Sequence, residues 1–481
     1  MTSLIKRNRW ITLILITGWL RPAIAQPTNG SSPSPQLTFL TLPQALELAR
    51  TNYPSLRGKL ATIRAAEAEA QAFQLSLLPQ AGTQAQVLNA TSNQVRGAYV
   101  SNGGLLLPIS GVRTDGFSNQ AAWTSGVSMV VDWEAITFGR RQARRQQARL
   151  AVEQAQADYE GELFKHQVRV CDAYLLALNA QKSVALQTAN LRRTQELQRI
   201  IRASTEGGLR PGIDSAVANT EVARAQLQVL ESRQLAQQQA LELTELIGQP
   251  SPTVQLDSMV FYNQLPKLPL TPGSNPALHP QLRVFQKNID LGRASETLLK
   301  AAALPSISVL GSLQGRGSGI SEQAQSDGTF RIDPSLVAGL PPRAFNYIVG
   351  VTAIWRPTDI FRSKYLVSAQ HERINAVQQA YNQQALGIQA ANQNAILQVQ
   401  LAQARAQQAP LQLDAARQAY IQSQARYESG LDNIQALTQT SALLNRAEVD
   451  QALVTSSVWR ALLLRAATAG DLDSFLQQLP H

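Results

Sequence analysis

The sequence contains one cysteine, Cys171, in 481 residues, so no disulfide within the chain can hold the fold together. Its four histidines, His166, His279, His371 and His481, are scattered, and none belongs to a paired metal-binding motif. The sequence also lacks a nucleophile elbow and a phosphate-binding loop. We therefore expect no enzymatic activity, no cofactor and no metal site.

Long apolar runs are scarce as well. After Gln26 no stretch approaches the about 20 apolar residues that a transmembrane helix needs. The run at residues 10–20 is too short to span a bilayer; it follows basic residues at 6, 7 and 9 and precedes a small-x-small sequence at 23–25. This order is typical of a secretory signal peptide, so residues 1–25 are predicted to be removed. A retained anchor is the alternative.

Acidic residues are outnumbered, because 33 Asp and Glu face 43 Lys and Arg and leave a net charge of +10. In a cytosolic protein this excess would suggest nucleic acid. An exported chain does not meet nucleic acid, and no aromatic-basic recognition motif is present. We therefore expect no nucleic-acid partner, and attribute the excess to solvated helix faces or to a charged pore wall.

What the sequence does contain is a long internal repeat. The segment that begins at Pro54 recurs 226 positions later, beginning at Pro280. A repeat of this length is half a molecule rather than a small solenoid unit. Each copy reads as helix, strand, polar loop, strand, very long helix, tight turn and helix. The matching residues are Pro54, Leu56, Arg57, Ala68, Leu78 and Pro79 with Pro280, Leu282, Arg283, Ala294, Leu304 and Pro305.

Two very long helices are predicted. Residues 140–206 contain no proline and one glycine, Gly161, and residues 362–428 are interrupted only by Gly387 and Pro410. At 1.5 Å per residue, each helix would be about 100 Å long. Apolar residues at three- and four-residue spacing favour coiled-coil packing, and Pro410 is expected to kink or locally open its helix. Glycine-containing turns at 206–213 and 428–433 then fold each chain back into a returning helix.

Segments with period-two alternation predict four strands, at about residues 80–89, 120–133, 306–314 and 345–356. Their apolar faces resemble lipid-facing barrel strands, although a half-buried hairpin in a soluble sheet has the same alternation. Residues 89–120 and 315–344 read as long polar loops, with a flexible glycine-rich stretch at 315–319. Closing a barrel takes about eight strands, and open sheet edges in lipid are costly. Membrane insertion would therefore require oligomerisation.

Several short motifs stand in a characteristic order. They are residues 42–49 before Pro54, Leu-Pro at 78–79 and 304–305, Phe-Gly-Arg at 138–140, and Gly-Leu turns at 208–209 and 430–431. In this order and spacing the chain resembles the TolC family of outer-membrane efflux proteins over residues 37–479. The resemblance implies a mainly α fold with a transmembrane β part. Duplicated long helical hairpins would form an α-barrel, and four strands per chain would complete a 12-stranded β-barrel in a trimer.

The repeat and the resemblance together divide the chain. The parts are a signal peptide at 1–25, an N-terminal linker at 26–40, a first repeat at 41–248, an inter-repeat equatorial linker at 249–276, a second repeat at 277–470 and a C-terminal tail at 471–481.

The implied function is an outer-membrane exit duct that passively conducts substrates from an inner-membrane pump, in efflux or type I secretion. The implied partners are two further copies in a homotrimer, a periplasmic adaptor (membrane fusion) protein, an inner-membrane RND or ABC transporter, and outer-membrane lipid. The alternative is an exported coiled-coil adaptor or an envelope scaffold without a channel. Such an adaptor normally carries one hairpin and a compact β-rich domain rather than two symmetric copies.

The hairpin tips are the candidate functional site. The resemblance implies that Gly-Leu turns meet hairpin tips of the adaptor, and the matching residues are Gly208, Leu209, Arg210, Gly430 and Leu431. An exposed leucine on a glycine turn is a small apolar knob for a helical partner. The alternative is a plain helix C-cap, which needs the glycine but not the leucine.

The same tips are implied to narrow the tunnel as a gate. Asp214 matches a family aspartate that forms an acidic ring, while in the second tip Gln435 and Thr438 replace further aspartates and Asp432 is a possible substitute. Tyr427 matches a tyrosine that can make a gate-closing hydrogen bond. A surface tyrosine packed on Leu431 is the alternative.

A basic cluster follows the second predicted strand. Its spacings of three and four stack it on one helical side. We favour a solvated stripe that meets anionic groups over an anion-favouring belt in the tunnel wall. Its members are Arg140, Arg141, Arg144, Arg145 and Arg149.

Overall fold

The computed structural model describes residues 39–91, 119–208, 210–249, 255–257, 261–262, 266, 279–327 and 330–479. The predicted signal peptide, most of both linkers and Leu209 lie outside these residues. What was predicted for them stays a prediction.

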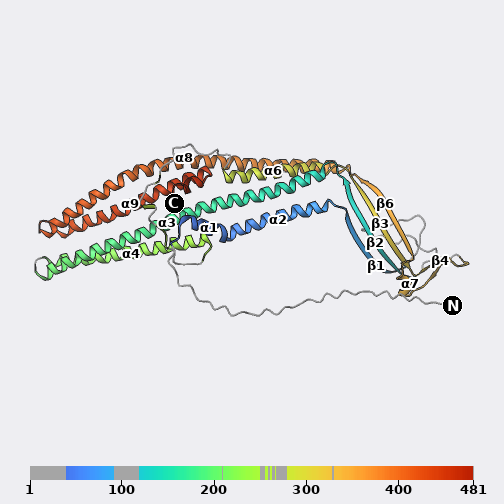
Figure 1. Cartoon of the computed structure of the whole chain (residues 1–481), viewed down its shortest axis with the longest axis horizontal. Helices are drawn as coiled ribbons and strands as arrows, with labels where there is room; N and C mark the ends of the chain where they lie inside the picture. Colours follow the sequence, from blue (N-terminus) through green and yellow to red (C-terminus); the bar gives the residue numbers. More distant parts are fainter. Residues whose placement is uncertain are drawn as a thin grey trace, which may run out of the picture. The chain divides into compact units, whose positions relative to one another are not determined.

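The two halves of the chain share a helix, two strands of the main sheet, a very long helix and a returning helix in the same order, and the second half adds β4, β5 and α7 between its two strands (Figure 1). The first half consists of α1 (Leu42–Asn52), α2 (Pro54–Ser76), β1 (Gln80–Thr91), β2 (Ala121–Ile136), α3 (Arg140–Glu206) and α4 (Gly212–Ile247). The second half consists of α6 (Pro280–Ala301), β3 (Ser306–Ser318), β4 (Ile320–Ala324), β5 (Phe330–Ile332), α7 (Leu336–Gly339), β6 (Ala344–Ile354), α8 (Asp359–Glu428), α9 (Ile434–Ala469) and α10 (Asp473–Leu476). The predicted mainly helical fold with long hairpins and a four-stranded sheet is confirmed.

Local sequence signals set the helix ends. Thr41 and Gln44 form a reciprocal capping box at the start of α1, and Pro54 occupies the first turn of α2, where its missing amide is not needed. Gly248 and Gly470 end α4 and α9 with φ of 70° and 74°, the left-handed conformation that favours glycine.

α8 runs as one helix through Pro410. The proline was expected to kink or locally open the helix, but the secondary structure neither stops nor restarts there. The bend of α8 in Figure 1 is spread along the helix. Among the described residues, no helix is long and apolar enough to cross a membrane.

The four-stranded antiparallel sheet has the order β1-β2-β3-β6. Its register aligns Thr83, Met129, Leu313 and Tyr347 in one row, and the neighbouring row aligns Gln84, Ser128, Gln314 and Asn346. Successive residues of a strand point to opposite faces, so the first row lies on an apolar face and the second on a polar face. Leu313 and Tyr347 are 61% and 78% exposed, so none of the described residues covers the apolar face there.

The glycine-rich stretch 315–319 is not the flexible loop that was predicted. β3 continues to Ser318, and the following residues form β4, β5 and α7. Glycine permits this because a side chain at Gly317 or Gly339 would collide with the backbone of Pro341 or Trp123. Ser125 Oγ donates to the Leu340 carbonyl at 2.9 Å, so the segment is fastened to the ends of β2 and β3.

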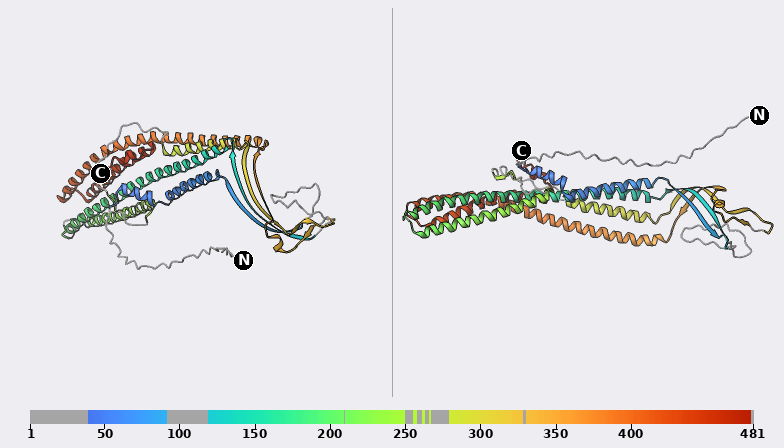
Figure 2. Two further views of the ribbon diagram at one scale, coloured as in Figure 1. Left: turned by 45° about the vertical axis from the view of Figure 1, so that its right-hand side comes forward. Right: turned by 90° about the horizontal axis from the view of Figure 1, so that it is seen from below.

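Each strand leads to a helix in the same lateral order. α2 packs on α3, α3 on α6 and α6 on α8, which repeats the order of the sheet. Further along, α4 packs on α3, α3 on α9 and α9 on α8, as the left view of Figure 2 shows. The described residues from 39 onward therefore form a single curved layer, which we call the wall. Among them, no further strand or helix covers its edges, which are β1 and β6 in the sheet, α2 and α8 in the neighbouring helices, and α4 and α8 toward the hairpin tips.

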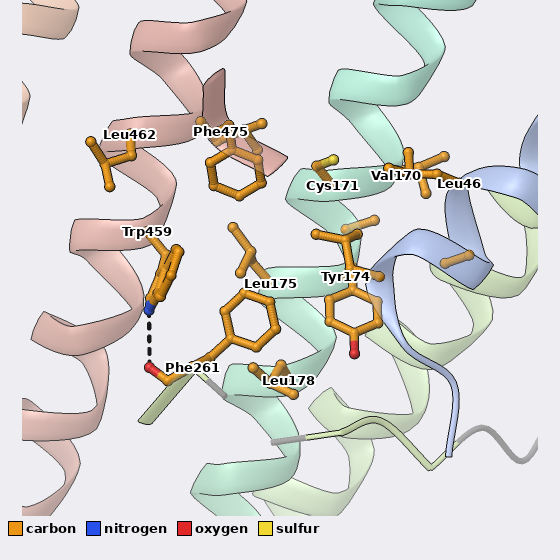
Figure 3. Packing of buried hydrophobic residues seen from close by; sticks show 14 of the residues in the cluster. Leu46, Val170, Cys171, Tyr174, Leu175, Leu178, Phe261, Trp459, Leu462 and Phe475 are labelled. Atoms are coloured by element: carbon orange, nitrogen blue, oxygen red, sulfur yellow. Dashed lines mark hydrogen bonds between the residues drawn. The ribbon is translucent and has the colours of Figure 1, made fainter. Parts of the chain in front are cut away.

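The main hydrophobic core lies at the middle of the helical part (Figure 3). Trp459 of α9 is 1% exposed, and its indole nitrogen donates to the Phe261 carbonyl at 3.0 Å. Phe261, from the segment between the repeats, also contacts Tyr174 of α3, with ring centroids 5.8 Å apart. Phe475 of α10 packs on Trp459 from the other end of the chain. Cys171 is buried in this core, and burial raises the pKa of its thiol.

Candidate functional site: the hairpin tips

Both hairpins end in a glycine turn at the same end of the molecule (Figure 1). Gly208 follows α3 with φ of 73°, and Gly430 follows α8 with φ of 74°. Each turn therefore uses a backbone conformation that other residues adopt only with strain. No neighbouring atom lies within 4 Å of a Cβ built on either glycine, so conformation rather than crowding requires glycine there.

Tyr427 joins the two tips. Its hydroxyl donates to Asp214 Oδ2 at 3.1 Å, across from the last turn of α8 to the first turn of α4. Arg210 places its guanidinium 4.3 Å from the centre of the Tyr427 ring and also donates to the Tyr427 carbonyl. Asp214 and Tyr427 are 8% and 4% exposed, so this contact is largely shielded from water. We call Arg210, Asp214 and Tyr427 the tip cluster.

Apolar residues surround the tip cluster. Ile201 and Ala218 of the first hairpin pack with Ile434 and Leu437 of the second. Their burial strengthens the hydrogen bond, because the local dielectric is low. Burial, and then the hydrogen bond to Asp214, raise the pKa of Tyr427 to about 12. The hydroxyl is therefore protonated at neutral pH and acts as the donor.

The outer side of the second turn is different. Leu431 is 70% exposed and has no cover within the described part of the chain. Asp432 accepts from Arg426 Nε at 3.3 Å within its own hairpin, and Asn433 caps α9 by accepting from the Ala436 amide at 3.0 Å.

The structure brings some of the predicted tip residues together and keeps others apart. It brings Arg210, which was assigned to docking, together with Asp214 and Tyr427 of the expected gate. Asp432 is engaged separately, and Leu209 lies outside the described residues. Tyr427 is buried, so it is not a surface tyrosine.

Four of the five arginines below β2 contact partners in β2, α2 or α3. Arg140 pairs with Glu134, and Arg141 donates to the Glu134 carbonyl. Arg144 lies 5.0 Å from the centre of the Phe73 ring of α2, Arg149 pairs with Glu153 at 3.1 Å, and Arg145 lines a groove between α2 and α3. The pKa of Glu153 is lowered because it also accepts from Lys287 at 2.7 Å. These partners divide the cluster between β2, α2 and α3.

One ion pair near the tips was missed from the sequence. Arg193 of α3 binds both carboxylate oxygens of Glu448 of α9, each at 2.7 Å. The pair locks the two hairpins together above the tip cluster. No local signal could have found it, because the residues are far apart in sequence and belong to different repeats.

Two of the histidines, His166 and His279, have structural roles. His166 stacks on Tyr53 with ring centroids 3.8 Å apart, and His279 caps α6 by accepting from the Gln281 amide. Burial lowers the pKa of both. Within the described ranges, no group of three or more His, Cys, Asp or Glu is placed to hold a metal ion.

Comparison with known proteins points to one family. The family model described as "Outer membrane efflux protein" matches residues 45–249 and 275–470. The pyoverdine export outer membrane protein OpmQ of Pseudomonas putida is 22% identical over 433 residues, which cover 89% of this chain and 86% of that protein.

Solved structures of similar fold cover the same part of the chain. The outer-membrane channel OprN is 19% identical with a TM-score of 0.66, and 89% of each chain is covered. The outer membrane channel MtrE of Neisseria gonorrhoeae, in its open state, is 16% identical with a TM-score of 0.70, again with 89% of each chain covered.

Proposed function

We propose that this chain, which belongs to the outer membrane efflux protein family, forms a homotrimeric conduit gated by its tip cluster. Membership makes it an outer-membrane efflux channel with a helical extension into the periplasm, working in a tripartite efflux system. The predicted function and location are confirmed at this level. An adaptor or a scaffold without a channel is excluded.

The open edges of the wall support the closed homo-oligomer. β1 and β6 each leave one side of the sheet unpaired, and unpaired backbone groups in lipid cost several kcal/mol each. Exposed apolar side chains continue along the edge helices, including Leu227 and Leu230 of α4 and Leu386 and Leu411 of α8. Copies joined edge to edge would pair the free backbone groups of the strands and bury the apolar side chains of the edge helices. The family resemblance favours three copies and twelve strands.

The hydrogen bond between Tyr427 and Asp214 is the observation on which the proposed gate rests. It ties the second hairpin to the first at the narrow periplasmic end, and Arg210 reinforces it from the other side of the ring. Outward movement of one hairpin would break both contacts. These two contacts support a tip that is held closed from within each chain.

A periplasmic adaptor protein is the proposed partner at these tips, and it would couple the channel to an RND or ABC transporter in the inner membrane. Leu431 is the apolar knob that such an adaptor would cover. Because Arg210 is turned toward Tyr427, we assign docking to Gly208, Leu209, Gly430 and Leu431, and Arg210 to the gate.

Electron imaging of the detergent-purified mature protein tests the assembly. We expect threefold particles with a hollow helical cylinder, in which the long helices measure about 100 Å. Particles with two copies or solid rods would reject the trimer. Adaptor binding to wild type would then be compared with binding to a Leu431→Asp variant.

A further inference from the structure

A cavity of about 610 Å³ lies between the two long hairpins near the middle of the helical part. Residues of α3, α4, α8 and α9 line it. Asp172 and Leu176 of α3 face this cavity, whereas Val170 and Tyr174 belong to the aromatic core. Residues two apart on a helix are separated by about 200°, so the cavity lies away from the Tyr174 ring around α3, while Ala173 and Leu246 belong to both the cavity lining and the hydrophobic core.

One ion pair closes the seam between α3 and α9 at this cavity. Arg460 binds Asp172 through both oxygens, with Nε–Oδ1 at 2.7 Å and Nη2–Oδ2 at 3.3 Å. The pair holds the two helices together. Because Arg460 and Asp172 neutralise each other, a ligand in the cavity would interact with the other charged groups of the lining.

Two other arginines in the lining have no such partner. Arg169 of α3 and Arg405 of α8 are exposed and form no ion pair among the described residues. Glu242 of α4 is the acidic group in the lining apart from the paired Asp172. Two unpaired guanidiniums against one carboxylate leave the cavity with a positive balance.

The rest of the lining is mainly apolar. Leu176, Leu246 and Leu464 come from three different helices and lie beside the charged groups. Apolar walls with a few convergent polar groups are typical of sites for small organic molecules. A guanidinium matches the two oxygens of a carboxylate in a bidentate geometry.

We propose that this cavity binds organic anions that carry carboxylates on an apolar body. Tyr174 and Phe261 pack on a different side of α3 from Asp172, so closure of the wall into a tube with these aromatic rings outside would turn the cavity toward the lumen. The site then faces passing cargo. This placement rests on the proposed conduit, whereas binding itself needs only the four helices of one chain.

Benzene-1,3,5-tricarboxylate is a suitable probe, because it combines an apolar ring with carboxylates and does not partition into detergent. Isothermal titration of the detergent-purified protein should show one site per chain. We expect the double variant Arg169→Gln/Arg405→Gln to bind about tenfold more weakly or worse, since charge-assisted hydrogen bonds are lost. Arg373→Gln is the matched control, since Arg373 is an exposed arginine of the same α8 and its side chain contacts Gln370 within one turn.

The outcomes separate the site from the conduit. Three outcomes would each reject the proposed anion site. They are wild-type particles of normal appearance that do not bind the probe, a double variant that binds it as tightly as wild type, and a loss of binding in the Arg373→Gln control equal to that of the double variant. The neutral trimethyl ester should not bind, and binding as tight as that of the acid would also overturn it. If the probe binds as expected but imaging shows no closed tube, the site stands and the conduit fails.

Discussion

At the scale of single residues, the Tyr427 hydroxyl is the group whose removal is most informative. Phenylalanine keeps the ring under Arg210 but leaves the buried Asp214 carboxylate without this donor. A hydrogen bond to a charged group is worth about 1.5–3 kcal/mol. We expect Tyr427→Phe to raise the open fraction of single channels in planar bilayers about tenfold or more.

Tyr420→Phe is the matched control for this variant. Tyr420 lies about two turns earlier on α8 and packs against the same apolar cluster. It makes no contact with Asp214 in the described structure, so its loss should leave channel opening unchanged. Equal opening of both variants would show that packing, not the hydrogen bond, keeps the tips together.

The pH dependence of the tip contact follows from the same tyrosine. Its pKa is raised from 10.0 to about 12 in the folded protein. A raised pKa means that the folded state retains the proton longer, so the stabilisation is complete below about pH 10 and is lost as pH rises through about 12. We expect channel opening to increase in this window in wild type, and Tyr427→Phe to be flat there. A wild-type profile that is also flat would contradict this assignment.

The sequence could name the members of the tip cluster but not their arrangement. Asp214 and Tyr427 were each predicted from the family resemblance. Their contact joins residues 213 positions apart and depends on how two hairpins pack, which no local pattern encodes. Arg210 was assigned to docking because it follows a Gly-Leu turn, and only the fold shows its guanidinium on the Tyr427 ring.

At the scale of elements, the two faces of β6 give a direct test of the membrane assignment. Val349 is 77% exposed on the apolar face at the middle of β6, and Thr352 lies on the polar face three residues further along the strand. A lysine on the lipid side near the bilayer midplane costs about 2–4 kcal/mol, whereas lumen substitutions are tolerated. We expect Val349→Lys to reduce the folded trimer in outer-membrane fractions, and Thr352→Lys to leave it near wild type. Equal yields of the two variants would contradict a lipid-facing Val349.

Elements differed in how well they could be predicted. Strict alternation identified all four strands of the main sheet, since period two separates the faces regardless of tertiary contacts. Residues 315–319 were misread because glycine is common in loops. Here Gly317 instead allows the backbone near Pro341 to pack closely on the strand, and such a contact between distant segments leaves no local periodicity.

The α8–α9 turn carries the prediction for partner docking. Leu431 extends from a glycine turn and its removal disturbs no buried contact, since it is 70% exposed. Leu431→Asp should therefore weaken binding of the adaptor that serves this channel about tenfold, the order expected for a truncated apolar anchor. Leu443→Asp, at a 51% exposed leucine further along α9, is the control. Adaptor binding is measured by pull-down, and channel conductance should stay unchanged if Leu431 acts in docking and not in gating. Unaltered adaptor binding by Leu431→Asp would show that Leu431 is not part of the interface.

At the scale of the whole molecule, duplication accounts for the edges on which the proposed homo-oligomer rests. Each repeat supplies two strands and one long hairpin, and the two repeats pack side by side with the same lateral order in sheet and helices. A wall built this way ends in β1 on one side and β6 on the other. In the proposed trimer, further copies pair with these edges. The strands alternate in direction, so β1 and β6 run in opposite directions, and β6 of one copy can pair antiparallel with β1 of the next around a rotation axis.

Cysteine cross-linking tests this closure directly. Cys171 is buried, so introduced thiols on the strands would react without competition. Barrel strands are tilted and staggered, so the register between copies is not the straight row seen within one chain. Gln84→Cys of β1 should be combined in turn with Asn346→Cys, Gly350→Cys or Thr352→Cys of β6. We expect one combination to give disulfide-linked dimers and trimers, but no larger species, on non-reducing gels. Ser128→Cys with Gln314→Cys, which face each other within one chain, should give monomers only. A ladder beyond three copies would indicate open association of edges instead of a closed trimer.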